Sequence, residues 1–96
     1  MPAYMIVNAN INDPDGYAAY QKRSPDVVKK FGGRFLVRGG KHEILEGQPV
    51  IVRSIVLEFP SFDEAKRFWN SPEYGELKRL RAGKAKLDIY LVEGAG

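Results

Sequence analysis

The sequence predicts an α+β domain of the ferredoxin-like class, with the element order βαββαβ. Apolar stretches of strand type occur in four places, helix start signals follow the first and the third, and glycine or proline marks the boundaries between segments. This order fits a four-stranded antiparallel sheet with the helices on one face.

The first strand is predicted at residues 3–11 and is followed by a helix start. Asp13 is the expected N-cap, and Pro14 occupies the first helical position, where its missing N–H is harmless. Ser24 and Pro25 repeat this start signal inside the helix. We therefore expect a kink or a second short helix, which ends at the double glycine of FGG.

The second and third strands are predicted at Arg34–Leu45 and Val50–Phe59. The turn residues EGQP between them predict an antiparallel hairpin. In that register Arg38 lies opposite Glu58, on the same face and with opposite charge. The double glycine after Arg38 predicts a bulge or tight bend, which leaves the face of the following His42 open.

The second helical segment begins with a capping box of Ser61 and Glu64. The sequence NSPEY then restarts the helix at Ser71, and its apolar stripe continues until Gly83. A last strand is predicted at Leu87–Val92.

The composition predicts one globular domain over residues 1–96, with 44% hydrophobic and 28% charged residues. There is no cysteine, so we expect neither a disulfide framework nor a thiolate zinc site, and a cytoplasmic location fits. The N-terminal apolar run has no basic stretch ahead of it and is interrupted by Asn8 and Asn10. We therefore expect neither a signal peptide nor a membrane span.

Several kinds of chemistry are disfavoured by the residue types. His42 is the only histidine, so we expect no metal centre and no cofactor. The glycines match neither a Walker loop nor GxGxxG, which disfavours nucleotide binding. The third strand offers Ser54, Val56 and Glu58 where an RNA-binding sheet presents aromatic side chains. Much of the positive charge lies in KRLRAGKAK at a helix end, so nucleic acid is not an expected partner.

The two faces of the predicted sheet differ in composition. By alternation, one face is apolar apart from Arg53 and is expected to pack on the helices. The other face mixes apolar and polar side chains: Tyr4, Ile6, Asn8, Leu36, Arg38, Val52, Ser54, Val56, Glu58, Asp88, Tyr90 and Val92. No helix remains to cover this second face, and so much exposed apolar surface is unusual for a monomer. We therefore expect a homodimer whose two sheets pack face to face.

A candidate ligand site follows from the polar groups on the second face and from the break between the later helical segments. A few polar groups inside an apolar cavity are the usual composition of a small-molecule site. The residues expected to bind the ligand are Asn8, Arg38, Ser54, Glu58, Trp69, Tyr74 and Tyr90. Arg38, His42 and Glu58 are the candidate catalytic residues, with Arg38 as the partner of an anion or carbonyl and the other two as acid or base.

Alternative interpretations stay open at this point. Arg38 and Glu58 can form an ion pair that neutralises both charges inside a filled interface. Trp69 can be an ordinary core residue, and Tyr17 and Tyr20 allow the same two interpretations.

Four segments of the chain resemble one known family: NDPDGYAAY, GGRFLVRGGKHEILEG, IVLEFPSFDEAKRFWNSPEY and LDIYLVEG. Together they are similar to the bacterial domain-of-unknown-function family 1330, within the dimeric α+β-barrel superfamily. The resemblance implies a ferredoxin-like monomer that pairs sheet to sheet. Related superfamily members include cofactor-free antibiotic-biosynthesis monooxygenases, muconolactone isomerases and haem-using peroxidase-like enzymes, with sites between sheet and helices or within the barrel. Haem is not expected in this chain, because His42 is its only histidine and follows a predicted bulge.

These observations lead to one functional hypothesis and one alternative. The hypothesis is a small cytoplasmic homodimer that binds a small organic molecule, anionic or neutral, in a pocket near the sheet, where cofactor-free proton transfer or oxygenation can take place. The alternative is a non-catalytic dimeric interaction or structural module.

Overall fold

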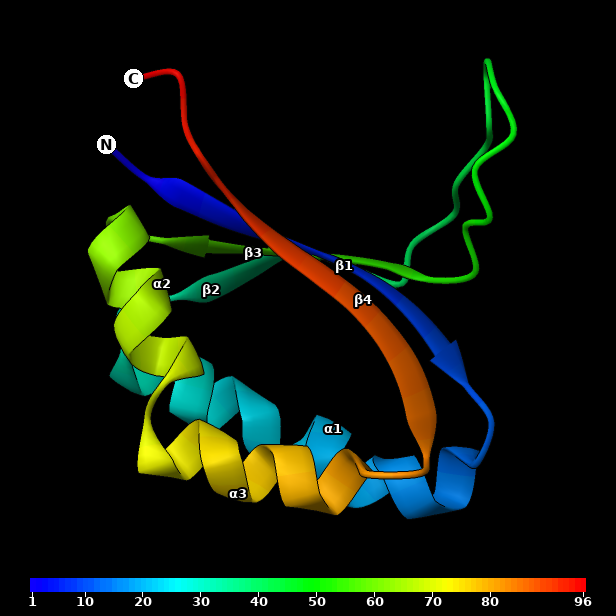
Figure 1. The fold of residues 1–96 in the computed structure, drawn as a ribbon, viewed down its shortest axis with the longest axis horizontal. Coiled ribbons are helices and arrows are strands. Elements are labelled where there is room, and N and C mark those ends of the chain that lie inside the picture. The colour runs from blue at the N-terminus through cyan, green and yellow to red at the C-terminus, as the bar shows by residue number, and fades with distance from the viewer.

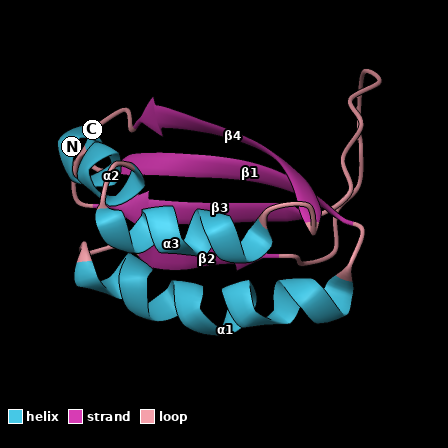
Figure 2. Ribbon diagram, turned by 60° about the horizontal axis from the view of Figure 1, so that its bottom comes forward, coloured by secondary structure: helices cyan, strands magenta, loops and turns pink.

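The computed structural model describes residues 1–96 and has the ferredoxin-like arrangement that the sequence predicts. The elements are β1 (Ala3–Ile11), α1 (Pro14–Lys30), β2 (Arg34–Arg38), β3 (Ser54–Phe59), α2 (Phe62–Trp69), α3 (Pro72–Arg81) and β4 (Ala85–Glu93). The strands form one antiparallel sheet in the order β2-β3-β1-β4. All three helices lie on the same side of this sheet (Figures 1 and 2).

Each helix begins at the cap that the sequence predicts. The side chain of Asp13 accepts a hydrogen bond from the Gly16 amide, at 3.0 Å. Ser61 and Ser71 cap α2 and α3 through their hydroxyl oxygens, at 3.1 Å from the amide of the residue three positions later in each case. These bonds satisfy amides that the helix itself leaves without an acceptor.

The structure of α1 differs from the sequence prediction in one respect. It runs as a single helix from Pro14 to Lys30 with Pro25 in its interior, and no second short helix begins at Ser24. Tyr17, Ser24 and Val28 are buried along its length. Burial of this helix face therefore outweighs the local start signal at Ser24, because packing can override the weaker preference of one residue.

The connection between β2 and β3 corrects a second prediction. The strand expected at Arg34–Leu45 ends at Arg38, and the strand expected at Val50–Phe59 begins at Ser54. The two strands pair antiparallel as predicted, but the long loop of residues 39–53 joins them in place of a short turn. This loop, green in Figure 1, stands out from the sheet on the side away from the helices. Asn8 holds its end: the side-chain amide donates to the Val50 carbonyl at 2.8 Å and its oxygen accepts from the Val52 amide at 2.9 Å.

The register of β2 against β3 is also different from the expected one. Arg34, not Arg38, lies opposite Glu58, and the two side chains form an ion pair at 2.8 Å. The ladder is irregular between Phe35 and Val37, several residues before the predicted bulge at the double glycine. A bulge reverses the alternation of side chains, so Arg38 lies on the helix side with Phe35 and not on the second face.

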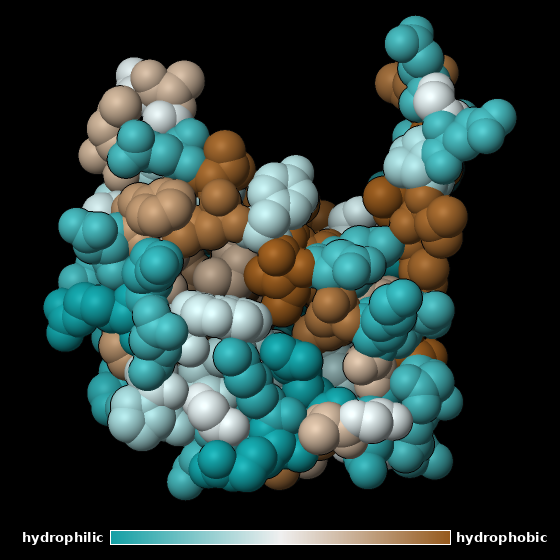
Figure 3. Space-filling view, viewed as in Figure 1, coloured by the Kyte–Doolittle hydropathy of each residue, from teal (hydrophilic) through white to brown (hydrophobic).

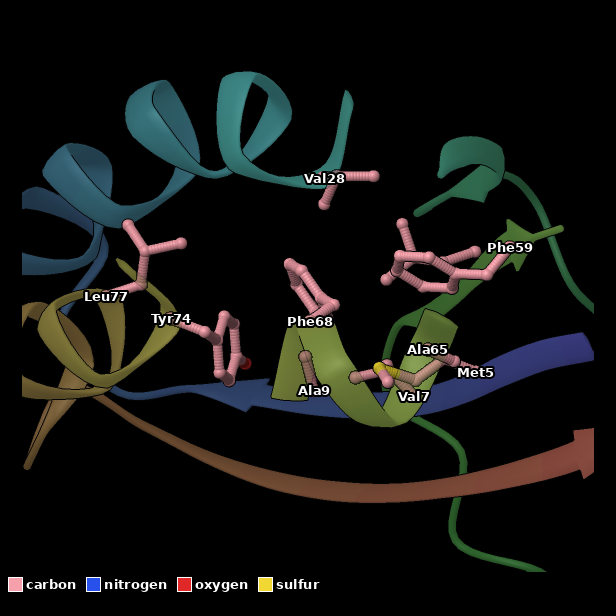
Figure 4. Packing of buried hydrophobic residues seen from close by; sticks show 10 residues of the cluster. Met5, Val7, Ala9, Val28, Phe59, Ala65, Phe68, Tyr74 and Leu77 are labelled. Atoms are coloured by element: carbon pink, nitrogen blue, oxygen red, sulfur yellow. The ribbon is translucent and has the colours of Figure 1, made fainter. Parts of the chain in front are cut away.

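The core fills the space between the sheet and the helices. The buried cluster consists of Met5, Val7, Ala9, Val28, Leu57, Phe59, Ala65, Phe68, Tyr74 and Leu77. Figure 4 shows Phe68 between Phe59 and Tyr74, and the ring centroids of these pairs are 5.0 and 4.7 Å apart. We call this side of the sheet the inner face. The strand residues in the cluster are among those predicted for it.

The opposite side, which we call the outer face, has no helix over it. Its exposed apolar side chains include Leu36, Val37, Tyr90 and Val92. Figure 3 shows the molecule hollowed above the sheet, between the upright loop 39–53 and the two chain termini. None of the three helices combines the length and the apolar character needed to cross a bilayer.

Candidate functional site

A pocket lies between the inner face of the sheet and the helices. The pocket is narrow: the centre of a water molecule can occupy about 40 Å³ of it, and the empty volume is about 540 Å³ only when gaps and open solvent are counted. Most of the wall is apolar and comes from strand residues such as Val7, Phe35 and Leu57, with Val28 and Phe68 from the helices. The polar residues that line it are Tyr17, Tyr20, Gln21, Ser24, Arg38, Arg53 and Tyr74. No carboxylate side chain lines this pocket.

Arg38 ends strand β2 and reaches toward α1. Its guanidinium carbon lies 4.5 Å from the centre of the Phe35 ring, and its Nη2 donates to the Gln21 carbonyl at 2.8 Å. The chain's ion pairs are formed by other cations, namely Arg23, Lys30, Arg34 and Arg67. Arg38 therefore keeps its full positive charge at the pocket without a counterion.

Arg53 supplies a second guanidinium just before β3. It packs against Gly39, which has a φ of +75°, and a Cβ at that position would overlap the guanidinium. The left-handed backbone and the close approach both require glycine there. The Nε of Arg53 is buried and has no hydrogen-bond partner. A buried donor without an acceptor is costly to the folded chain.

Three tyrosines face the same space. Tyr17 and Tyr20 come from α1, with ring centroids 5.0 Å apart, and Tyr74 comes from α3. The hydroxyls of Tyr20 and Tyr74 are 3.1 Å apart, and Arg81 donates a long bond of 3.4 Å to the Tyr74 hydroxyl oxygen. Only one of the two hydroxyl hydrogens is used between the two tyrosines. The other remains a free donor beside the pocket.

Burial raises the pKa of the two phenols of α1, Tyr17 and Tyr20. It raises the pKa of Tyr17, against the opposing effect of the positive charges of Arg81, Arg53 and Arg38. Burial also raises the pKa of Tyr20, and the nearby Tyr74, which is hydrogen-bonded to it, adds to this rise. At neutral pH both side chains are therefore hydrogen-bond donors surrounded by positive charge.

The arrangement is rich in donors and poor in acceptors. A guanidinium can only donate, and the free phenolic hydrogen adds another donor. Such a pocket complements a ligand that carries acceptor oxygens and a negative charge, while the apolar and aromatic walls suit a planar organic body. The described chain has no group of three or more histidine, cysteine, aspartate or glutamate residues placed to hold a metal ion.

The predicted ligand residues are divided among several places. Arg38 and Tyr74 line the pocket. Asn8 holds the loop 39–53, and Ser54 lies opposite it at the start of β3. Trp69 and Tyr90 line a separate groove beside α2 and β4, where the Lys78 ammonium lies 3.8 Å from the centre of the Trp69 ring.

The other two candidate catalytic residues lie outside the pocket. Glu58 is on the outer face, paired with Arg34. His42 is exposed in the loop 39–53. The structure therefore does not bring either residue to Arg38, and the expected Arg38–Glu58 pair does not form.

Arg53 and the tyrosine pair of α1 belong to the pocket although the ligand prediction left them out. The alternation of β3 had already placed Arg53 on the helix side as the one charged residue of an apolar face. A charged residue on the core-facing side of a strand indicates a functional site, because charges without a partner are rarely placed there. Tyr17 and Tyr20 share one face of α1 by their spacing of three residues.

The comparisons with known proteins agree with this fold. The family described as Domain of unknown function (DUF1330) matches residues 2–95. No curated protein matches the sequence.

Solved structures share the fold at low identity. A protein of unknown function from Rhodopseudomonas palustris superposes with a TM-score of 0.75 at 20% identity, over 99% of this chain and 83% of that one. SnoaB, a cofactor-independent oxygenase from Streptomyces nogalater, gives 0.62 at 10% identity, over 99% and 94%. A dimeric ferredoxin-like protein of unknown function from Thermobifida fusca gives 0.58 at 11% identity, over 98% and 92%.

Proposed function

The chain belongs to the DUF1330 family of domains of unknown function, and we propose that it binds a small organic anion in the pocket between the sheet and the helices. The observation that carries this proposal is the charge pattern of the pocket. Arg38 and Arg53 border it, neither forms an ion pair within the chain, and no carboxylate lines it. An anionic ligand supplies the missing counterion.

The ligand class follows from the other walls. The pocket is mostly apolar, with Phe35, Phe68 and Tyr74 among its aromatic residues. A conjugated or aromatic carboxylate, enolate or phenolate combines a flat apolar body with acceptor oxygens. Such a ligand buries apolar area and satisfies the buried Arg53 Nε and the free phenolic hydrogen at the same time.

The proposal includes a homodimer built on the outer face. That face presents apolar side chains to solvent, and Tyr90 alone keeps 62% of its surface exposed. A second copy offers the same surface, so a two-fold axis that runs between the two sheets covers both copies at once. The dimeric ferredoxin-like protein from Thermobifida fusca shows that this fold occurs in dimers.

We further propose that the chain catalyses a cofactor-free reaction of the bound anion. SnoaB has the same fold and is a cofactor-independent oxygenase. In this chain, Arg38 and Arg53 would stabilise a substrate anion, which is the form that gives up electrons most readily, and the phenols would hold its oxygen atoms. Binding without turnover is the second candidate, and it is favoured by the absence of imidazole and carboxylate groups from the pocket walls.

The test uses benzoate and its neutral isostere benzamide as probes in calorimetry. Benzoate should bind and benzamide should bind at least about tenfold more weakly, because a hydrogen bond to a charged group contributes roughly 1.5–3 kcal/mol. Arg38→Ala should weaken benzoate binding by a similar factor. Arg79→Ala, which removes an exposed arginine outside the pocket, is the matched control and should leave binding unchanged. Equal binding of both probes, or benzoate binding that survives loss of Arg38, would refute the proposal.

A further inference from the structure

Pro25 is the one proline of the chain inside a helix. Pro14 and Pro72 begin α1 and α3, where a missing N–H costs nothing, whereas Pro25 lies in the interior of α1. An interior proline cannot donate to the carbonyl four residues earlier, and its ring presses on that carbonyl. In α1 this carbonyl belongs to Gln21.

The Gln21 carbonyl has a replacement donor from another element. Arg38 Nη2, at the end of β2, donates to it at 2.8 Å. The donor is charged, so this bond is stronger than the amide bond that the proline removes. The same guanidinium lies 4.5 Å from the centre of the Phe35 ring, which supports it from its own strand. Two contacts from different elements therefore fix its place at the pocket.

We infer that Pro25 is a positioning residue: by leaving the Gln21 carbonyl without its helical donor, it fixes the Arg38 guanidinium at the anion site. A helix with alanine at this position would direct that carbonyl along its axis to the restored amide and away from β2. Pro25 thus destabilises α1 locally, and the carbonyl that it leaves free restrains the side chain of Arg38. The effect on ligand binding rests on the proposed function, whereas the anchoring of Arg38 rests on the geometry alone.

The experiment replaces Pro25 with alanine and compares it with Pro14→Ala as the matched control. Pro25→Ala should raise the Tm by at least about 4 °C, because it restores a helical hydrogen bond in a domain of this size. The ¹⁵Nε–¹Hε heteronuclear NOE of Arg38 should fall, since the side chain loses its anchor. Benzoate should bind about fivefold to tenfold more weakly, and a more stable protein that binds more weakly is not the result of general damage. Pro14→Ala should leave the NOE and the affinity unchanged.

The combined variant with Arg38→Ala tests the coupling. If Pro25 acts through Arg38, adding Pro25→Ala to Arg38→Ala should have no further effect on benzoate affinity. An unchanged Arg38 NOE in Pro25→Ala overturns the inference. A lower Arg38 NOE with unchanged benzoate affinity would show that Pro25 anchors Arg38 but that this anchoring does not contribute to ligand binding, which overturns that part of the inference. Wild-type protein that does not bind benzoate counts against the proposed function, and the NOE comparison still decides whether Pro25 anchors Arg38.

Discussion

The inner and outer faces of the sheet are built from the same strands but have different surroundings. The inner face is covered by three helices and encloses a pocket with arginine and tyrosine side chains. The outer face carries apolar side chains of the same kind as the core, yet nothing in one chain covers it. Alternation along the strands thus supplies two apolar surfaces, and the helices bury one of them as the core while the other stays exposed in the single chain.

The largest expected effect is on the inner face. Phe68→Ala should lower the free energy of unfolding by about 3–5 kcal/mol, because it removes a fully buried ring that packs against Phe59, Phe31 and Tyr74. Phe62→Ala, at a ring that is 37% exposed on the same helix, should cost about 1 kcal/mol or less. Urea unfolding measures both. Equal losses would contradict the assignment of the core to this face.

The next effect concerns the outer face. Tyr90→Glu should raise the dimer dissociation constant by at least about 30-fold, because it replaces a large exposed aromatic side chain of the proposed interface with a charge. Tyr90 is exposed in the single chain, so the monomer should fold normally. Ala18→Glu adds the same charge at an exposed site on α1 and should leave the dimer intact. Sedimentation equilibrium separates these outcomes, and a wild-type protein that is monomeric at micromolar concentration would remove the interface altogether.

A smaller effect comes from pH and again belongs to the inner face. Burial raises the pKa of Tyr20 above its ordinary value of 10.0, so the folded chain keeps a proton that the unfolded chain loses. The stability linked to Tyr20 is therefore complete below pH 10 and falls as the pH rises above it. Tyr20→Phe should lose less stability than wild type between pH 9 and about 11. Parallel pH profiles of the two proteins would show that Tyr20 is not buried as described.

Local signals predicted the parts of the fold that depend on neighbouring residues. The caps at Asp13, Ser61 and Ser71 and the strand β1 follow from residues a few positions apart, and the structure confirms them. The sequence predicts strand for residues 39–45 and 50–53 of the loop, because their apolar runs on either side of the turn residues EGQP suit two strands. Alternation does not show whether a partner strand is present, and the hydrogen bonds from Asn8 that hold this loop join residues more than forty positions apart.

The prediction of the site depended on the register of one short strand. A single irregularity between Phe35 and Val37 moves Arg38 from the outer to the inner face, and no glycine or proline at that point indicates it. Arg38 therefore lines the pocket on the inner face, and not the outer face on which the sequence placed it. Arg53 was placed on the correct face, because the alternation of β3 is regular up to its start.

We propose different partners for the two faces, a small anion at the inner face and a second copy at the outer face. A benzoate titration of the dimer, followed by ¹H–¹⁵N correlation spectra, separates the two faces. The chemical shift changes should gather at the pocket, around Arg38, Arg53 and Tyr74, and the amide signals of Tyr90 and Val92 should stay in place. Shifts gathered on the outer face, with the pocket residues unmoved, would contradict the proposal.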